Sequence, residues 1–270
     1  MVKIIGAVAM NMDNNHQDTA QPIARIVGLY KAFDQQDVLH GINIEFAKGE
    51  CTVVLGPSGC GKSVMLKHLL GLLIPDRGEV WFEDKRVDML AESELAPIRR
   101  QFGFLFQNGA LFDSMNVREN IAFPLREHTD LSADQRLFRV KEVLDMVGMI
   151  ESISKMPAEL SGGQQKRIAL ARAIVLQPKV VLYDEPTTGL DPIRADSIND
   201  LIIKLQRELS ITSIVVTHDL ASAFKIADSM IMLYDGHVQM RGTPQEFRQS
   251  SNQAVQRFLN AHGTGDFATW

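Results

Sequence analysis

The feature that most restricts the fold is an eight-residue segment, residues 56–63, with the sequence GPSGCGKS. It fits the pattern G-x-x-x-x-G-K-[ST], in which glycines let successive backbone N–H groups turn towards phosphate oxygens. In this pattern the lysine, Lys62, neutralises the outer phosphates, and the Ser63 hydroxyl is a ligand for Mg²⁺. We therefore expect a bound nucleotide to contact Gly56, Pro57, Ser58, Gly59, Cys60, Gly61, Lys62, Ser63 and Val64.

The residues on either side of this loop predict a strand and a helix. Residues 50–55 form a short run with β-branched side chains, and residues 63–70 have a helical pattern that ends at Gly71. The phosphates would then lie at a helix N-terminus, where unpaired N–H groups and the helix dipole favour anions. The alternative, a chance glycine-rich turn, does not account for this context.

Three further motifs follow the loop in order along the chain. They are LSGGQQ at residues 160–165, VVLYDE at residues 180–185 and THD at residues 217–219. Together with the phosphate loop, this ordered set resembles the signature set of the ABC ATPases. The resemblance covers nearly the whole chain, and it implies an ATP hydrolase that works with ATP and Mg²⁺.

The alternation of hydrophobic patterns predicts an α/β fold. Strand signals separated by helical patterns indicate a mainly parallel sheet, and earlier strand signals indicate a small antiparallel sheet. The parallel strands are expected at residues 180–183, 213–217 and 230–234, and the antiparallel ones at residues 23–33, 42–46 and near 78–82. We thus expect a P-loop NTPase core with an N-terminal antiparallel β subdomain and an inserted helical subdomain.

The expected organisation is one ABC ATPase domain over residues 23–243, with its helical subdomain at about residues 108–165. Residues 244–270 are expected to form a C-terminal helical tail, because its start combines a capping box with proline at the first helical position. Residues 1–22 are expected to be a disordered tail. The alternative is a signal peptide whose apolar region would be residues 4–10.

Composition limits the classes of partner. The net charge of −5 argues against a nucleic-acid surface, so no nucleic-acid partner is expected. No segment approaches the roughly 20 apolar residues that a membrane-spanning helix needs. The two cysteines, Cys51 and Cys60, lie in a predicted strand and in the phosphate loop, so they do not indicate a disulfide framework. A reducing cytoplasm is the expected location.

The catalytic groups are expected at the ends of strands. Asp184 ends an apolar strand, from which its carboxylate can hold Mg²⁺ through water, and Glu185 lies one step further on the other side of the pleat. Glu185 is therefore the expected general base; the alternative for this acidic pair is a solvated turn. The resemblance implies that His218 contacts the γ-phosphate and that Gln107 senses both the γ-phosphate and Mg²⁺. The expected metal-binding residues are Ser63, Gln107 and Asp184.

A second anion site is expected at the signature motif. Ser161, Gly162, Gly163 and Gln164 stand at the start of a helical run, where N–H groups and the helix dipole favour anions. In the ABC family one chain cannot fold this motif onto its own phosphate loop. The resemblance therefore implies a dimer of two copies, with two ATP molecules between the phosphate loop of one copy and the signature of the other.

The resemblance implies roles for two further regions, and the sequence departs from the family pattern at one position. It implies that Phe33 stacks on adenine, for which the alternative is a core phenylalanine, and that residues 188–191 form a loop spanning the dimer. Val64 stands where many relatives carry a second hydroxyl for the α-phosphate, a loss worth only about 0.5 to 1.5 kcal/mol. Because Glu185 and His218 are both present, we expect two competent sites.

Local segments are similar to the MlaF-type subfamily, whose members power phospholipid movement with a membrane permease and an MCE lipid-binding protein. These segments are residues 109–112, 115–117, 123–129 and 255–260. The sequence EPTTGL at residues 185–190 departs from many MlaF-like sequences and has the commoner ABC form. An importer for another solute, such as an amino acid, is therefore kept as the alternative.

The subfamily resemblance also implies partners and a location. The expected partners are a second copy of the chain, an MlaE-like permease, an MCE protein within the complex and a small regulatory STAS-domain protein. The chain would lie on the cytoplasmic face of the inner membrane through the permease. Leu111, Phe112 and Met115 follow Gln107 and could receive a permease helix, although each could instead pack in the core. A non-transport ABC ATPase usually needs two nucleotide domains or a coiled-coil insertion, and neither is found.

Overall fold

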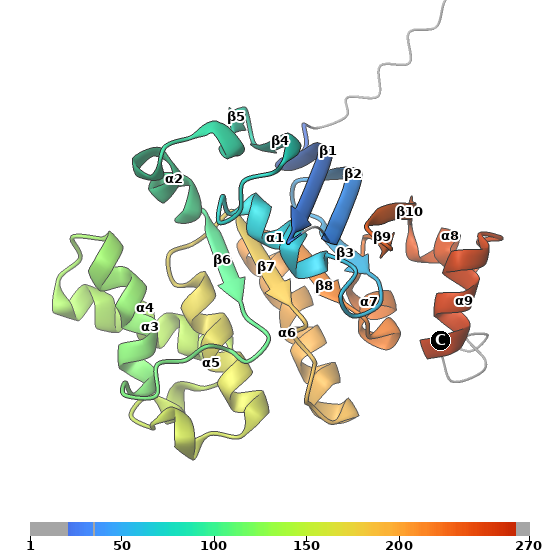
Figure 1. Cartoon of the computed structure of the whole chain (residues 1–270). Coiled ribbons are helices and arrows are strands. Elements are labelled where there is room, and N and C mark those ends of the chain that lie inside the picture. Colours follow the sequence, from blue (N-terminus) through green and yellow to red (C-terminus); the bar gives the residue numbers. More distant parts are fainter. Residues whose placement is uncertain (1–20, 35, 263–270) are drawn as a thin grey trace, which may run out of the picture.

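The structure, a computed structural model, describes residues 21–34 and 36–262, and its centre is a six-stranded sheet in the order β10-β9-β3-β8-β7-β6 (Figure 1). The strands are β3 (Cys51–Leu55), β6 (Phe102–Leu105), β7 (Val180–Asp184), β8 (Thr212–Thr217), β9 (Ser229–Tyr234) and β10 (His237–Gly242). Neighbouring strands are parallel except β9 and β10. Both faces of a parallel sheet are covered, which is why β3 and β8 are fully buried along their length.

Alternate side chains of the central sheet enter two separate hydrophobic cores. Val53 and Leu55 of β3 belong to one core, whereas Val54 belongs to the other. This division follows from the two-residue period of a strand, in which successive side chains point to opposite faces. The first core contains residues of α5 (Gly162–Ile174), α6 (Pro192–Leu209) and α7 (Leu220–Ile226), and the second contains residues of α1 (Lys62–Leu69) and of a second sheet.

The second sheet is antiparallel and has the order β2-β1-β4-β5. Its strands are β1 (Ala24–Phe33), β2 (Gln36–Phe46), β4 (Arg77–Phe82) and β5 (Lys85–Arg86). Strand β2 also reaches the edge of the central sheet, since the His40 N–H donates to the Gly236 carbonyl at 2.9 Å and the rings of His40 and His237 stack with centroids 4.8 Å apart. These contacts fix the small sheet beside the central one.

Apart from β6, the elements between β5 and β7 are helices and 3-10 turns. They are the 3-10 turn Val87–Met89, α2 (Glu92–Arg99), α3 (Val117–His128), α4 (Ala133–Met146), the 3-10 turns Ile150–Ser152 and Pro157–Glu159, and α5. Asn116, Ser132 and Ser161 cap α3, α4 and α5 through capping boxes, which satisfy backbone donors at the helix starts. Helices α3 and α4 pack against α5 and form the side of the molecule farthest from α8 and α9 (Figure 1).

The C-terminal part has two short helices, α8 (Pro244–Arg248) and α9 (Gln253–His262). Thr243 caps α8 by accepting from the Glu246 N–H at 3.2 Å. Phe247, Val255, Phe258 and Leu259 are buried in the first core, so this part packs onto the domain. In the part of the chain that the structure describes, none of the helices has the length and apolar character needed to cross a membrane.

The structure confirms the predicted α/β class with a mainly parallel sheet and an antiparallel sheet, but several elements differ from the sequence expectations. Strand β2 begins at Gln36, six residues before the expected start, because it pairs with the whole end of β1. Strand β6 and helix α2 were not predicted. The C-terminal helix breaks between α8 and α9. The expected disordered or signal segment, residues 1–22, lies almost wholly outside the described residues, and the domain boundaries stay a prediction.

Candidate nucleotide-binding site

Four loops that follow parallel strands meet at one edge of the central sheet. The phosphate loop follows β3, Gln107 follows β6, Glu185 follows β7 and His218 follows β8. The carboxyl ends of parallel strands lie at the same edge, which is where ligands bind in open α/β sheets. The fold thus places groups from four distant segments of the sequence around one site.

Close packing fixes the shape of the phosphate loop. A Cβ atom at Gly56 would lie 2.1 Å from the Leu233 carbonyl oxygen of β9. A Cβ atom at Gly61, whose φ is 101°, would lie 2.6 Å from Leu39 of β2. Both positions therefore require glycine. Pro57, Ser58 and Gly59 form the accessible part of the loop, whereas Cys60 is buried and Val64 packs on the second core.

The start of α1 offers an anion site. The helix begins at Lys62, and no side chain in the described part of the chain caps it, so its first N–H groups face the loop. The buried Lys62 ammonium donates to the carbonyl oxygens of Gly56 at 2.7 Å and Pro57 at 2.9 Å, and it lies 3.8 Å from Glu185 Oε1. The charge is held beside the place where outer phosphates would lie. Burial raises the pKa of the Cys60 thiol, which keeps this neighbour uncharged.

Two oxygen ligands suited to Mg²⁺ lie side by side in this site. Ser63 Oγ donates a hydrogen bond to Asp184 Oδ1 at 2.9 Å. Burial raises the pKa of Asp184, the Ser63 hydrogen bond opposes this rise, and the charge of Glu185 adds to it. Mg²⁺ prefers oxygen ligands and is commonly held by one or two protein groups together with phosphates. The hydroxyl and the carboxylate therefore fit a magnesium–nucleotide complex.

Glu185 follows the last residue of β7 and has a left-handed backbone with a φ of 50°. The direction of its side chain is therefore set by this turn and not, as expected from the sequence, by the pleat of the strand. Such a conformation costs about 1 to 3 kcal/mol for a residue other than glycine. The backbone is held by the Glu185 N–H bond to the Val216 carbonyl at 2.9 Å. The carboxylate accepts from Thr188 Oγ1 and Thr217 Oγ1, each at 3.2 Å, and from His218 Nδ1 at 3.0 Å.

The hydrogen bond between His218 and Glu185 sets the state of the imidazole ring. A carboxylate can only accept, so Nδ1 carries the hydrogen and donates it to Glu185. Nε2 is left on the outer side of the ring, and the side chain is 43% exposed. A carboxylate with these three donors has a fixed direction, and it can accept a proton from a water molecule held nearby.

Gln107 and Phe33, two further residues of the expected site, both have exposed side chains. The side chain of Gln107 is exposed, while its backbone carbonyl accepts from the buried Lys166 ammonium. Phe33 is the last residue of β1, and its ring is 40% exposed with the Lys31 ammonium 5.4 Å from its centroid. The ring is therefore not buried in the core, as the alternative interpretation requires. It is accessible to a flat ligand.

The signature residues form the start of α5. Ser161 accepts from the Gln164 N–H at 3.4 Å, and the Gln164 side chain accepts from the Ser161 N–H at 2.9 Å. A Cβ atom at Gly162 or Gly163 would come no closer than 3.6 Å to any neighbouring group, so contacts within the chain do not require these glycines. Within residues 21–34 and 36–262, no hydrogen bond joins this motif to the phosphate loop. The structure does not bring the two anion sites together in one chain.

The sequence expectations missed Lys166, a buried lysine on α5. Its ammonium donates to the carbonyl oxygens of Gln107 and, at 3.4 Å, Glu185. Burial lowers the pKa of Lys166, and the charges of Asp184 and Glu185 oppose this change. Its position directly after the signature motif was the only available signal, and a lysine in a predicted helix is usually solvent-exposed.

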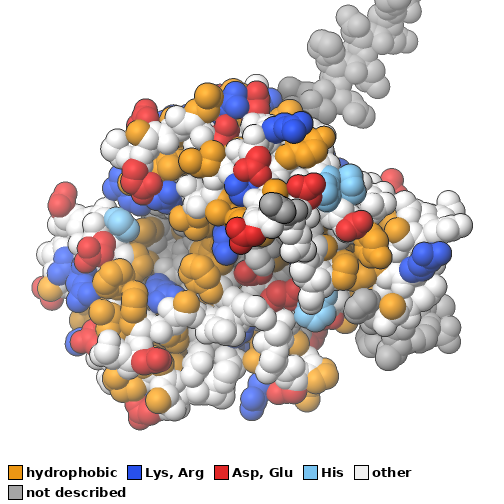
Figure 2. Space-filling model, viewed as in Figure 1, with side chains coloured by type: hydrophobic (Ala, Val, Ile, Leu, Met, Phe, Trp, Pro, Cys, Tyr) orange, Lys and Arg blue, Asp and Glu red, His pale blue; other side chains and the backbone are white. Residues whose placement is uncertain are grey.

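A groove of about 610 Å³ lies next to the site, beside β6. Its lining combines aromatic and basic side chains, including Phe104, Phe106, Phe112, Phe123, Arg99, Arg100, His128 and Arg172. Figure 2 shows hydrophobic side chains around a hollow in this region of the surface. Of the three expected groove residues, Phe112 lines the groove and is 41% exposed, Leu111 packs against the first core, and Met115 is partly buried outside the lining.

A buried amide fixes the loop that carries Phe112. The Asn120 side chain is fully buried and accepts from the Phe112 N–H at 2.8 Å. It also donates to the carbonyl oxygens of Phe112 at 3.1 Å and Met115 at 2.9 Å. The Phe112 ring then contacts Phe123, with centroids 5.0 Å apart, and lies 5.6 Å from the Arg172 guanidinium.

Comparisons with known proteins agree with this geometry. Residues 39–188 match the ABC transporter family. The chain is 41% identical over 240 residues to the probable ribonucleotide transport ATP-binding protein mkl of Mycobacterium leprae, covering 89% of this chain and 69% of that protein. It is 40% identical over 228 residues to the intermembrane phospholipid transport system ATP-binding protein MlaF of Haemophilus influenzae, covering 84% of this chain and 86% of that protein.

A solved structure with the same fold is the dimeric, post-hydrolysis ATP-binding cassette MJ0796 bound to ADP and Pi. It is 33% identical to this chain, with a TM-score of 0.75, and the match covers 82% of this chain and 98% of that one. The family match spans the phosphate loop, the signature and the acidic strand end. The chain therefore belongs to the ABC transporter family, and it is an ATP-hydrolysing cassette of that family.

Proposed function

We propose that this chain hydrolyses ATP to power a transporter that moves phospholipid between membranes. The observation that carries the proposal is the similarity to MlaF over most of both chains. The similar segments around Phe112 and in α9 support it from within the sequence. The cassette would act on the cytoplasmic face of the inner membrane, attached through an MlaE-like permease. An MCE protein and a STAS-domain protein are the further partners of this proposal.

The proposed roles follow the geometry of the site. Glu185 acts as general base towards the attacking water, and His218 fixes the carboxylate and faces the γ-phosphate. Lys62 and the N-terminus of α1 stabilise charge on the phosphates, and Phe33 stacks on adenine. Ser63, Asp184 and Gln107 would hold Mg²⁺, which neutralises phosphate charge when bound. Positioning and charge stabilisation then account for hydrolysis.

The signature is proposed to act on the nucleotide of a second copy. Ser161 and Gly162 are exposed at the start of α5, and the similar cassette MJ0796 is dimeric. Two copies would enclose two ATP molecules between opposite phosphate loops and signatures. Each copy carries both Glu185 and His218, so both sites are proposed to hydrolyse ATP.

The groove beside β6 is proposed to receive the permease. Its aromatic lining can bury apolar side chains of a helix, and its arginines can bind acidic groups or helix C-terminal carbonyls. The groove lies next to Gln107 in the chain, so its shape can depend on the state of the γ-phosphate. This adjacency gives a physical route from ATP to the membrane.

A second candidate cargo is a ribonucleotide, which the name of the mycobacterial relative suggests. The similarity to that relative is as high as the similarity to MlaF, so the cassette alone does not separate the two cargoes. The cargo path would lie in the permease and its partners. The test must therefore be made on the whole complex.

The cargo is tested by isolating the chain with its permease from native membrane and analysing bound small molecules by mass spectrometry. We expect phospholipid to copurify and to stimulate ATP hydrolysis when supplied in vesicles. Bound ribonucleotide in place of lipid, with stimulation by ribonucleotide alone, would favour the second candidate. A complex lacking this chain serves as the control for adventitious lipid.

Glu185→Gln is expected to keep ATP binding and to lower kcat by at least about 100-fold, because the amide cannot accept the proton from water. The phosphate contacts survive, so an ATP-bound dimer should accumulate, as measured by light scattering after size-exclusion chromatography. Glu119→Gln, in the capping box of α3, is the matched control and should retain turnover. Near wild-type turnover of the Glu185 variant would exclude this residue as the base.

Asp184→Asn is expected to abolish Mg²⁺-dependent hydrolysis while raising the melting temperature of the nucleotide-free protein at neutral pH. Burial raises the pKa of Asp184, so the ionised carboxylate costs stability as the pH rises through that pKa. The neutral amide removes this cost and can still accept from Ser63. The difference in melting temperature between the variant and wild type should become smaller as the pH falls, because Asp184 of the wild type then becomes protonated. A lower melting temperature than wild type at neutral pH would contradict the sign of the shift.

Phe112→Ser is expected to reduce copurification of the permease while changing the melting temperature by no more than about 2 °C, since Phe112 is 41% exposed and outside the buried core. Phe138→Ser is the matched control, because Phe138 is 72% exposed on α4 outside the groove. Changing Leu111 as well would mix docking with stability, because Leu111 packs on the core. Equal permease binding by both variants would overturn the groove assignment.

A further inference from the structure

The Lys166 ammonium lies where three functional segments meet. It projects from α5, the helix that begins with the signature, and it donates to the backbone carbonyls of Gln107 and Glu185. Gln107 belongs to the segment after β6, and Glu185 to the turn after β7. One side chain therefore joins the signature helix to two segments of the nucleotide site in the same chain.

The cost of burying this charge indicates a role beyond packing. Lys166 is 6% exposed, and an ammonium removed from water loses hydration that two carbonyl contacts only partly replace. Burial lowers the pKa of Lys166, as expected for a desolvated cation. A methionine could fill the same space without this cost. What methionine cannot do is hold two carbonyl oxygens from different segments.

The segment around Gln107 lies along α5 at further points. A Cβ atom at Gly109 would be 3.4 Å from the Ala169 Cβ, and Arg172 Nη2 donates to the Gly109 carbonyl at 2.9 Å. Lys166 and Arg172 thus hold residues 107–109 to two successive turns of the same helix. A shift of this segment would be passed to α5.

Helix α5 is continuous from Gly162 to Ile174, so its start moves with Lys166. Lys166 lies five residues after Ser161, about 7.5 Å along the helix axis at a rise of about 1.5 Å per residue. The distance is short enough for a displacement of the Gln107 backbone to change the direction of the signature. The signature in turn contacts the nucleotide of the other copy in the proposed dimer.

We propose that Lys166 is a positioning residue that holds the γ-phosphate sensor Gln107 and the base Glu185 in register with the signature at the start of α5. Through it, the state of the nucleotide bound by one chain sets the placement of the signature that completes the partner's site. The inference rests on the proposed roles of Gln107, Glu185 and the dimer, and it is independent of the cargo.

The test replaces the ammonium with an apolar side chain of similar length. In the full chain, Lys166→Met should lower kcat at least about tenfold, since small misplacements of catalytic groups have large effects on rate. KM should stay within about threefold of wild type, because the phosphate loop supplies most ground-state contacts. The melting temperature is measured alongside, so that a loss of kcat can be separated from a loss of folded protein. Wild-type kcat would overturn the proposal.

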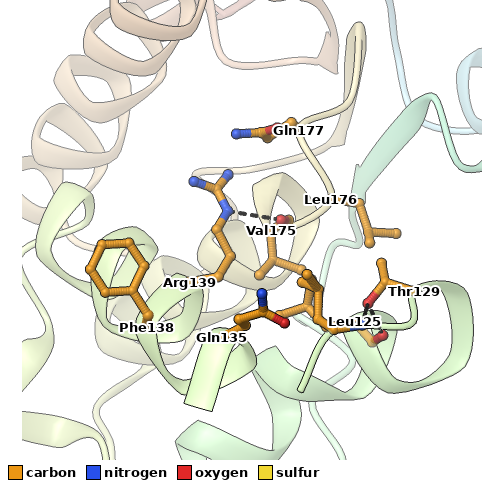
Figure 3. Close-up of a pocket in the computed structure, with 9 residues that line it drawn as sticks. Leu125, Thr129, Gln135, Phe138, Arg139, Val175, Leu176 and Gln177 are labelled. Carbon is orange, nitrogen blue, oxygen red and sulfur yellow. Dashed lines mark hydrogen bonds between the residues drawn. The ribbon is translucent and has the colours of Figure 1, made fainter. Parts of the chain in front are cut away.

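A matched control uses a cation that holds carbonyls at the other end of α5. Arg139 of α4 donates to the Val175 carbonyl at 3.0 Å and to the Ile174 carbonyl at 3.3 Å, as part of a separate pocket (Figure 3). Arg139→Met should lower the melting temperature, because its side chain is only 11% exposed, and should leave kcat within about twofold, because the carbonyls it holds lie at the end of α5 opposite the signature. If it reduces kcat as much as Lys166→Met, general loosening of the helix explains the effect and the proposal fails.

A second measurement tests the link to the partner. In the Glu185→Gln background, Lys166→Met should raise the ATP concentration needed for half-maximal dimerisation at least about tenfold, because the signature is misplaced. ATP binding to the monomer should be unchanged. If dimerisation is unaffected, Lys166 acts only within its own site and the link is refuted. Hydrolysis by wild type and its loss in Glu185→Gln, in the same assay, support the proposed function whatever Lys166 does.

Discussion

Close backbone packing around the phosphate loop is the constraint on which the nucleotide site depends. At Gly56 and Gly61 the loop touches β9 and β2, and no side chain fits between. The loop therefore takes its shape from both sheets, which are themselves joined through His40 and Gly236. As a result, the N-terminus of α1 has a fixed direction before any ligand arrives, and binding needs little reorganisation of the backbone.

The charged side chains of the site lie in pairs of opposite sign and are largely buried. Asp184 and Glu185 lie among Lys62 and Lys166, and each of these cations is itself held by backbone carbonyls. A triphosphate adds negative charge, for which Lys62 is the nearest cation in the phosphate loop. The left-handed turn at Glu185 and the burial of Asp184, which raises its pKa, each cost stability. Bound nucleotide and metal would compensate for both costs.

The sequence was most informative where a local pattern has one physical solution. The phosphate loop could be predicted because its glycines, lysine and serine have a fixed spacing, and β8 because its apolar run is continuous. Strand β6 was missed because it has four residues, one of them glycine, and its burial depends on α5. The turn at Glu185 could not be predicted, since a left-handed φ at glutamate arises from its contacts with Val216 and Thr217.

The fully buried amide of Asn120 determines how the groove can be used. Because it holds the loop of Phe112 through both the N–H and the carbonyl of that residue, the loop has already lost its conformational entropy when the protein folds. A partner that enters the groove meets a rigid ring and does not have to order a flexible segment. Association through this surface should then depend on shape complementarity and on the encounter rate. Because the loop is rigid, a displacement of the Phe112 ring by a partner would also displace α3, which carries Asn120.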